Sequence, residues 1–121
     1  MEIHIDDKKR LNDLKSEFSQ LYPFLKLEFF HHSHKVGSGS PKSDMITSNP
    51  VIGEIRSKHN EGNMVINGDL SVNMVEQEFE RKYGIHAQVF RKSGNIWLET
   101  SATDDWSLNE QNVMGREMSE V

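Results

Sequence analysis

Three of the six histidines in this chain of 121 residues lie close together, at His31, His32 and His34. On an extended segment alternate side chains point the same way, so His32 and His34 would lie about 7 Å apart, which one tetrahedral zinc ion can bridge with some bending. A third ligand would have to come from His59, His86 or a carboxylate. The alternative is an exposed strand end whose imidazoles titrate in solvent, and we favour it because the spacing fixes no third ligand.

The segment after the histidines is rich in small residues that could surround an anion. Residues 37–43 read Gly-Ser-Gly-Ser-Pro-Lys-Ser, and Lys35 and the expected helix start at Asn49-Pro50 would add positive potential. The residue order of a phosphate-binding P-loop is absent, and a proline interrupts the run. A flexible connection is the favoured interpretation. A metal- or anion-binding protein that uses the histidines and this loop is the alternative functional hypothesis.

Aromatic residues mark a second candidate surface. Phe30, Phe90 and Trp97 fall at strand positions that would share one face of a sheet, and Arg91 and Lys92 flank them. Tryptophan and arginine in an exposed patch are typical of protein interfaces and require no phosphate. The leading hypothesis is a non-enzymatic module that binds a protein or peptide through this face, as a monomer or a weak homodimer.

The same aromatic face has two other interpretations. Trp106, Leu108 and a closing helix could cover it and form a second small core. RNA-recognition modules also stack bases on exposed sheet aromatics. Residues 1–60 carry a formal charge of +1 and residues 61–121 a charge of −6, so the acidic second half would repel a phosphate backbone. We therefore do not expect nucleic-acid binding.

The sequence offers little for catalysis. Asp104 and Asp105 are adjacent, so their side chains diverge on any regular structure, and helix capping explains them better. His86 would lie opposite Ser101, but no orienting acid accompanies this pair. The absence of cysteine excludes disulfides, thiolate metal sites and cysteine nucleophiles. We expect no enzymatic activity and no cofactor, with zinc at the histidines as the one alternative.

Composition places the chain among ordinary globular proteins. It has 35% hydrophobic and 27% charged residues, with a mean hydropathy of −0.68. One α+β domain is expected over residues 1–112, with a flexible loop at 33–48 and a disordered tail at 113–121. The N-terminus lacks the cationic start and apolar run of a signal peptide, and no apolar run approaches the ~20 residues that cross a bilayer. We expect a cytoplasmic protein without membrane attachment.

Hydrophobic periodicity predicts the elements of the first half. Apolar residues at spacings of three and four predict a helix over 7–21, which Pro23 ends. Alternation then predicts a half-buried strand over 24–32. Asn49-Pro50 resembles a helix start, so a short helix is expected over 50–58, followed by a strand at 64–66.

The second half carries clearer signals. Ser71 as N-cap and Gly84 at the C-terminus bound a helix over 71–83. Two strands, 86–92 and 95–101, flank a hairpin turn at Ser93-Gly94. Ser107 and Glu110 have the spacing of a capping box for a closing helix over 106–111. The predicted hairpin register pairs Arg91 with Ile96, Phe90 with Trp97, Val89 with Leu98, and Ala87 with Thr100.

These elements predict an α+β, two-layer sandwich. Two longer helices would cover one face of a mixed four-stranded sheet, and both a β-grasp-like and a split β-α-β arrangement fit the order of elements. The string VFRKSGNIWLETSATDDWSLNEQN, residues 89–112, resembles the C-terminal half of a set of small, uncharacterised bacterial proteins. The resemblance extends over about residues 50–112. It implies a shared fold, and it carries over no activity and no functional residue.

Overall fold

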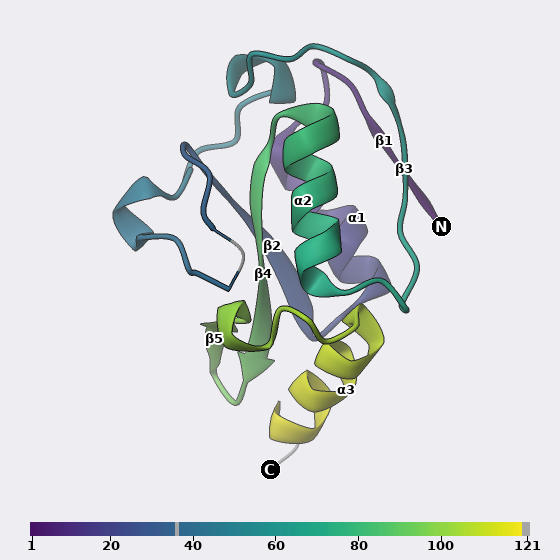
Figure 1. Cartoon of the computed structure of the whole chain (residues 1–121), viewed down its shortest axis with the longest axis vertical. Helices are drawn as coiled ribbons and strands as arrows, with labels where there is room; N and C mark the ends of the chain where they lie inside the picture. The colour runs from purple at the N-terminus through teal and green to yellow at the C-terminus, as the bar shows by residue number, and fades with distance from the viewer. Residues whose placement is uncertain (36, 120–121) are drawn as a thin grey trace.

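Three α-helices and two antiparallel sheets make up the described part of the computed structural model, residues 1–35 and 37–119 (Figure 1). The α+β class predicted from the sequence is confirmed. The single mixed sheet, on which the β-grasp-like and split β-α-β alternatives both rest, is wrong. The strands divide into a pair and a group of three, and every pairing is antiparallel. No helix in the described ranges is long and apolar enough to span a bilayer.

The two-stranded sheet joins β1 (Glu2–Ile5) to β3 (Gly62–Val65), with Ile3 opposite Met64. The sequence did not predict β1, because the alternating pattern of this segment is short and places only two apolar residues, Ile3 and Ile5, on one face. Both of these side chains are fully buried. Burial in the tertiary structure, more than local pattern, therefore explains this strand.

The three-stranded sheet places β4 (His86–Ser93) between β2 (Leu25–Phe30) and β5 (Ile96–Glu99). The existence of the β4–β5 hairpin is as predicted, but its register is wrong. Ser93 pairs with Ile96, which makes Gly94 and Asn95 the turn residues. Gly94 has φ 60°, a left-handed conformation that glycine adopts without strain.

The register correction moves Trp97 along its strand but leaves it on the same face of the sheet. Trp97 lies opposite Lys92 and not Phe90, and Leu98 lies opposite Arg91. Because side chains alternate between faces, a shift by an even number of residues keeps each side chain on its face. Leu98 and Ile96, which were expected to lie under helices, are exposed.

Both ends of α2 (Val72–Tyr83) agree with the sequence prediction. The Ser71 hydroxyl accepts a hydrogen bond from a backbone amide of the first turn, which is the N-cap arrangement. Gly84 adopts φ 68°, and the amide of Ile85 donates to the carbonyl of Phe79 at 3.0 Å. This Schellman closure turns the chain directly into β4.

The start of α1 (Leu11–Leu21) depends on a distant segment of the chain. The amide of Leu11 donates to the Pro50 carbonyl at 3.0 Å, and the amide of Asn12 donates to Oδ1 of Asn49 at 2.9 Å. Asn49 therefore caps α1 and does not begin a helix of its own. The helix predicted over 50–58 is wrong, because this region holds only the 3₁₀ turn η2 (Ile52–Glu54).

Replacement of Asn49 by alanine removes this cap and should lower the free energy of unfolding by about 1 kcal/mol. Urea denaturation followed by circular dichroism measures the change. Ser48→Ala, at the exposed neighbouring position, is the matched control and should leave the midpoint unchanged. Equal midpoints for the two variants would contradict the capping role.

Residues after β5 form the short turn η3 (Ser101–Thr103) and then α3 (Leu108–Ser119). The predicted capping box is confirmed: Ser107 and Glu110 exchange backbone-to-side-chain hydrogen bonds, each 3.1 Å long. The helix continues to Ser119, whereas the sequence predicts a disordered tail from residue 113. The inner side of α3 packs on β4 and β2, which stabilises its last turns.

In its described residues, the predicted loop at 33–48 contains one 3₁₀ turn, η1 (Lys42–Asp44), and the chain then returns along the outer edge of β2. The amide of Ile46 donates to the Phe29 carbonyl at 2.8 Å. A single apolar core joins both sheets and the helices, with α1 packed on β2 and α2 on β4 (Figure 1). Its largest fully buried side chains include Phe18, Phe29, Phe79 and Tyr83.

Candidate functional site

The three aromatic residues of the leading hypothesis share one face of the β2–β4–β5 sheet, as the strand registers show. Phe30 is only 2% exposed and Phe90 only 8%. Trp97 is half-buried, and Nζ of Lys26 lies 5.0 Å above its ring centroid. The face therefore presents Trp97 and Lys26 to solvent but little of either phenylalanine.

The two flanking cations point to opposite faces of the sheet. Lys92 lies opposite Trp97 and shares its face. Arg91 lies on the other face, where Nη1 donates to Oε1 of Gln111 at 2.9 Å and the guanidinium packs 5.9 Å from the centroid of Trp106. Arg91 thus helps to hold α3 and does not border the aromatic face.

The three neighbouring histidines have different surroundings. His31 is exposed, and the ring of His32 pairs with Oδ1 of Asp44 at 2.7 Å. The ring of His34 lies at the wall of a pocket beside α2. Within residues 1–35 and 37–119, no group of three or more histidine or acidic side chains is placed to hold a metal ion.

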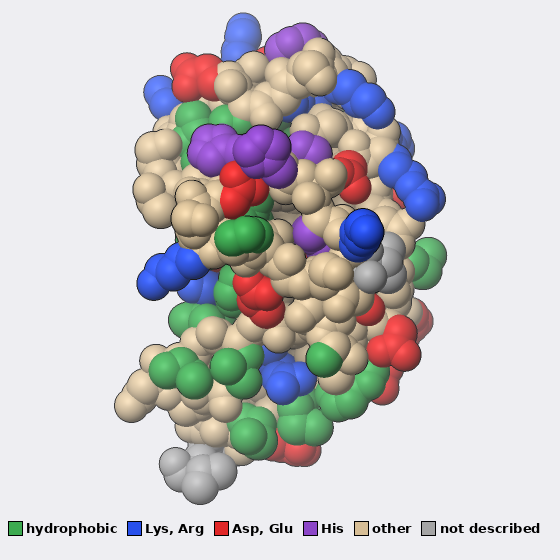
Figure 2. Space-filling model, turned by 60° about the vertical axis from the view of Figure 1, so that its left-hand side comes forward, with side chains coloured by type: hydrophobic (Ala, Val, Ile, Leu, Met, Phe, Trp, Pro, Cys, Tyr) green, Lys and Arg blue, Asp and Glu red, His purple; other side chains and the backbone are tan. Residues whose placement is uncertain are grey.

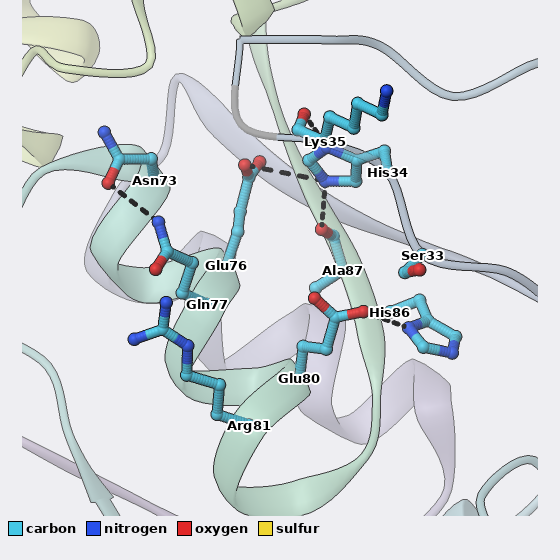
Figure 3. Close-up of a pocket in the computed structure, with 10 residues that line it drawn as sticks. All are labelled: Ser33, His34, Lys35, Asn73, Glu76, Gln77, Glu80, Arg81, His86 and Ala87. Atoms are coloured by element: carbon cyan, nitrogen blue, oxygen red, sulfur yellow. Dashed lines mark hydrogen bonds and ion pairs between the residues drawn. The ribbon is translucent and has the colours of Figure 1, made fainter.

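The pocket beside α2 has a volume of about 320 Å³, within the range of small-ligand sites. It lies between α2, the start of β4 and the segment just after β2 (Figure 3). Figure 2 shows histidine side chains gathered over this side of the molecule. The lining residues are Ser33, His34, Lys35, Asn73, Glu76, Gln77, Glu80, Arg81, His86 and Ala87.

Helical periodicity explains why α2 contributes half of this lining. Its apolar residues Val72, Val75 and Phe79 turn into the core. Residues at positions 73, 76, 77, 80 and 81 follow the same spacing of three and four on the adjoining side, and all of them are polar. One helix therefore supplies both a wall of the core and a wall of the pocket.

The edge of β4 supplies the opposite wall, because β5 pairs with Phe90–Ser93 and then turns away. Glu76 is 6% exposed, and its Oε2 accepts a hydrogen bond of 2.8 Å from the backbone amide of Val89. Burial raises the pKa of Glu76 to about 7. The charges of Asp104 and Glu99 act in the same direction, and the Val89 amide and His34 oppose it.

His34 lies beside Glu76, with 3.7 Å between Nε2 and Oε1 of Glu76. Its Nδ1 faces the Lys35 carbonyl at 3.0 Å, and Nε2 faces the Ala87 carbonyl at 3.3 Å. Two carbonyl neighbours favour the imidazolium, because both ring nitrogens must then donate. Burial alone would lower the pKa of His34, but these carbonyls and the Glu76 charge outweigh it and raise the pKa.

A second carboxylate and imidazole pair completes the pocket. Glu80 Oε1 lies 3.1 Å from Nδ1 of His86, and the Gln77 amide donates to Asn73 Oδ1 at 3.3 Å (Figure 3). Two carboxylates and two amide oxygens thus line the interior. The cations Lys35 and Arg81 are exposed, so solvent screens their charge. The arrangement can accept hydrogen bonds from a cationic group and can exchange a proton near neutral pH.

Sequence reasoning did not identify Glu76 or Glu80 as site residues. Glu76 follows Val72 by four positions and precedes Phe79 by three, so it borders the apolar stripe of the helix. A carboxylate at that border could have been used to predict a site residue, since such a group is often partly buried. The pairing with His34 depends on tertiary structure and leaves no local pattern.

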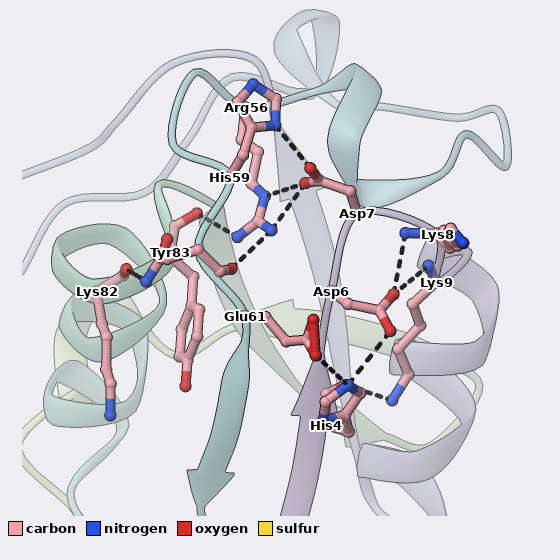
Figure 4. A network of polar contacts seen from close by, with 11 residues as sticks. His4, Asp6, Asp7, Lys8, Lys9, Arg56, His59, Glu61, Lys82 and Tyr83 are labelled. Carbon is pink, nitrogen blue, oxygen red and sulfur yellow. Dashed lines mark hydrogen bonds and ion pairs between the residues drawn. The ribbon is translucent and has the colours of Figure 1, made fainter.

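A second network of charged groups surrounds Arg56, and it shares no residue with the pocket lining (Figure 4). The guanidinium of Arg56 is fully buried and donates to Asp7 Oδ1 through Nε at 3.0 Å and Nη2 at 2.8 Å. It also donates to the backbone carbonyls of Tyr83 and Asn60. Arg56 therefore connects the segment after β1, the segment before β3 and the end of α2.

No family model, no curated protein and no solved structure matches this chain. The resemblance of residues 50–112 to small bacterial proteins stays a prediction. The functional interpretation of the candidate site therefore rests on the geometry of its residues.

Proposed function

We propose that this chain binds a small molecule with a cationic nitrogen in the pocket beside α2. The observation that carries the proposal is the buried carboxylate of Glu76, which lines a cavity of about 320 Å³ and has its pKa raised to about 7. Buried carboxylates with shifted pKa values in a pocket are typical of functional sites.

The chemistry of the lining favours a hydrogen-bond donor with positive charge. Glu76 and Glu80 are acceptors, and the amide oxygens of Asn73 and Gln77 add two more. A guanidinium or ammonium group would donate to these oxygens and offset the cost of burying Glu76. An anion would meet both carboxylates and is disfavoured, because Lys35 and Arg81 are exposed and His34 already pairs with Glu76.

The test is a two-dimensional amide NMR titration with agmatine as the probe, because it carries a guanidinium and an ammonium group. Saturable shifts at Asn73, Glu76, Gln77 and Glu80 are expected. Glu76 loses its proton as the pH rises through about 7, so binding should be about tenfold tighter at pH 8 than at pH 6.

Glu76→Gln is the diagnostic variant, because the amide oxygen can still accept from Val89 while the charge is lost. It should abolish the agmatine shifts, whereas Glu78→Gln, at an exposed position of the same helix, should preserve them. Butyrate and zinc chloride are parallel probes. Saturable butyrate shifts in the pocket, zinc shifts that map to His31, His32 and His34, or no saturable agmatine shift would each overturn the proposal.

A further inference from the structure

Apart from Leu108, which is buried in the core, the large apolar residues of α3 are at least partly exposed to solvent. Val113 is 42% exposed and Met118 47%, and Met114 beside them is partly exposed. The buried side of the same helix carries Leu108 at its first position and then Gln111 and Gly115. Surface helices normally turn their apolar stripe inward, whereas α3 beyond Leu108 buries a polar residue and a glycine.

Polar bonds and close backbone packing hold the inner side of α3 in place. The Gln111 side chain donates to the backbone and hydroxyl oxygens of Thr103, at 2.7 and 2.8 Å, and accepts from Arg91. A Cβ added to Gly115 would lie 2.8 Å from Cβ of Phe24, so only glycine allows this close approach. Leu108 anchors the first turn in the core, and the rest of the helix is held without burial of Val113 or Met118.

The outer side of α3 forms a shallow groove of about 410 Å³. Trp106, Val113 and Met114 supply its apolar lining, and Glu110 and Glu117 lie along it. Figure 2 shows hydrophobic side chains gathered at the end of the molecule that α3 and β5 form in Figure 1. Exposed tryptophan and methionine are enriched in protein interfaces, and methionine adapts its shape to a partner.

The charged residues beside the groove indicate which kind of partner it could bind. A second copy of α3 packed antiparallel on the first would bring Glu110 of one copy close to Glu117 of the other, with like charges in contact. The half of the chain that contains α3 carries a charge of −6. Both facts disfavour self-association and favour a basic partner.

We infer that the outer face of α3 binds a basic amphipathic helix of a partner protein. Apolar side chains of that helix occupy the groove between Trp106 and Met114, and its lysine or arginine residues pair with Glu110 and Glu117. Helix-in-groove recognition uses anchors spaced over two to three turns. The 12 residues of α3 provide about 18 Å of length, enough for such a set. This inference does not depend on the ligand proposed for the pocket.

The inference can be tested on the full chain by fluorescence anisotropy. The probe is a labelled synthetic helical peptide that has leucine on one face and lysine on the opposite face. Saturable binding is expected and should weaken as salt is added, because the rim contacts are exposed ion pairs. The same peptide with glutamate in place of lysine should not bind. A scrambled peptide of identical composition, which has no apolar face, should also fail.

Two pairs of variants assign the site. Val113→Ser combined with Met114→Ser should weaken binding about tenfold or more. Met74→Ser, which changes an exposed methionine on α2, should not alter binding. Glu110→Gln with Glu117→Gln should reduce the salt dependence, whereas Glu54→Gln with Glu78→Gln should leave it unchanged. An amide spectrum that changes only near the substituted positions shows that each variant is folded.

Three outcomes would overturn the inference. The first is equal affinity for the basic, acidic and scrambled peptides. The second is binding that survives the double serine variant. The third is a concentration-dependent dimer, seen by sedimentation, that Val113→Ser dissociates, since the groove would then serve a second copy of this chain.

Discussion

Replacement of Arg56 by methionine should lower the free energy of unfolding by about 2–4 kcal/mol, the largest effect we expect from a single substitution outside the apolar core. Methionine fills a similar volume but donates no hydrogen bond. The variant leaves the carbonyls of Tyr83 and Asn60 without their donor and deprives Asp7 of its partner (Figure 4). Chemical denaturation at pH 7 measures the loss.

The control for Arg56 is Arg116→Met, at an exposed position of α3, which should change stability by less than about 0.5 kcal/mol. Asp7→Asn should reproduce part of the Arg56→Met loss, because the Arg56 hydrogen bonds lower the pKa of Asp7 and favour its charged form. A loss in Arg56→Met no larger than in the control would show that the hydrogen bonds of Arg56 contribute little to stability.

Glu76→Gln should make the protein more stable at pH 8, by about 2 kcal/mol, while its stability at pH 4 stays close to that of the wild type. In the wild type, burial raises the pKa of Glu76 from 4.5 to about 7. A raised pKa gives stability that is present below pH 4.5 and is lost as the pH rises through 7. His34, whose pKa is also raised, adds a loss in the same direction above pH 6.5.

The measurement is a series of urea unfolding curves between pH 4 and pH 9 for the wild type, Glu76→Gln and Glu78→Gln. The slope of stability against pH should flatten in Glu76→Gln and persist in Glu78→Gln, which alters an exposed carboxylate. Parallel curves for all three proteins would contradict the assignment. A variant that gains stability while it loses agmatine binding would show a cost that the site imposes on the fold.

The elements that could be predicted from the sequence are those whose boundaries are set by neighbouring residues. Ser71 and Gly84 bound α2, and Ser107 with Glu110 begins α3, because each capping group bonds within its own turn or the adjacent one. The start of α1 could not be predicted in this way. Asn49, which looks like the cap of a following helix, instead caps a helix that precedes it by many residues.

The candidate site was harder to predict than the fold. His34 was identified, but with the two histidines beside it and not with Glu76, which lies on a different element. The pocket exists because β5 turns away from β4 and leaves space beside α2. Strand divergence of this kind depends on the packing of the whole chain, and a hydrophobic pattern contains no information about it.

The same divergence leaves the first part of β4 paired with β2 on one side but with no strand on the other, and such open sheet edges are prone to aggregate. Glu76 accepts from the Val89 amide there, the His34 ring faces the Ala87 carbonyl, and Thr100 donates to the Val89 carbonyl. Side chains therefore occupy backbone groups that another polypeptide would need in order to add a strand. Glu76 and His34, which line the pocket, thus also protect this edge from intermolecular β-sheet formation.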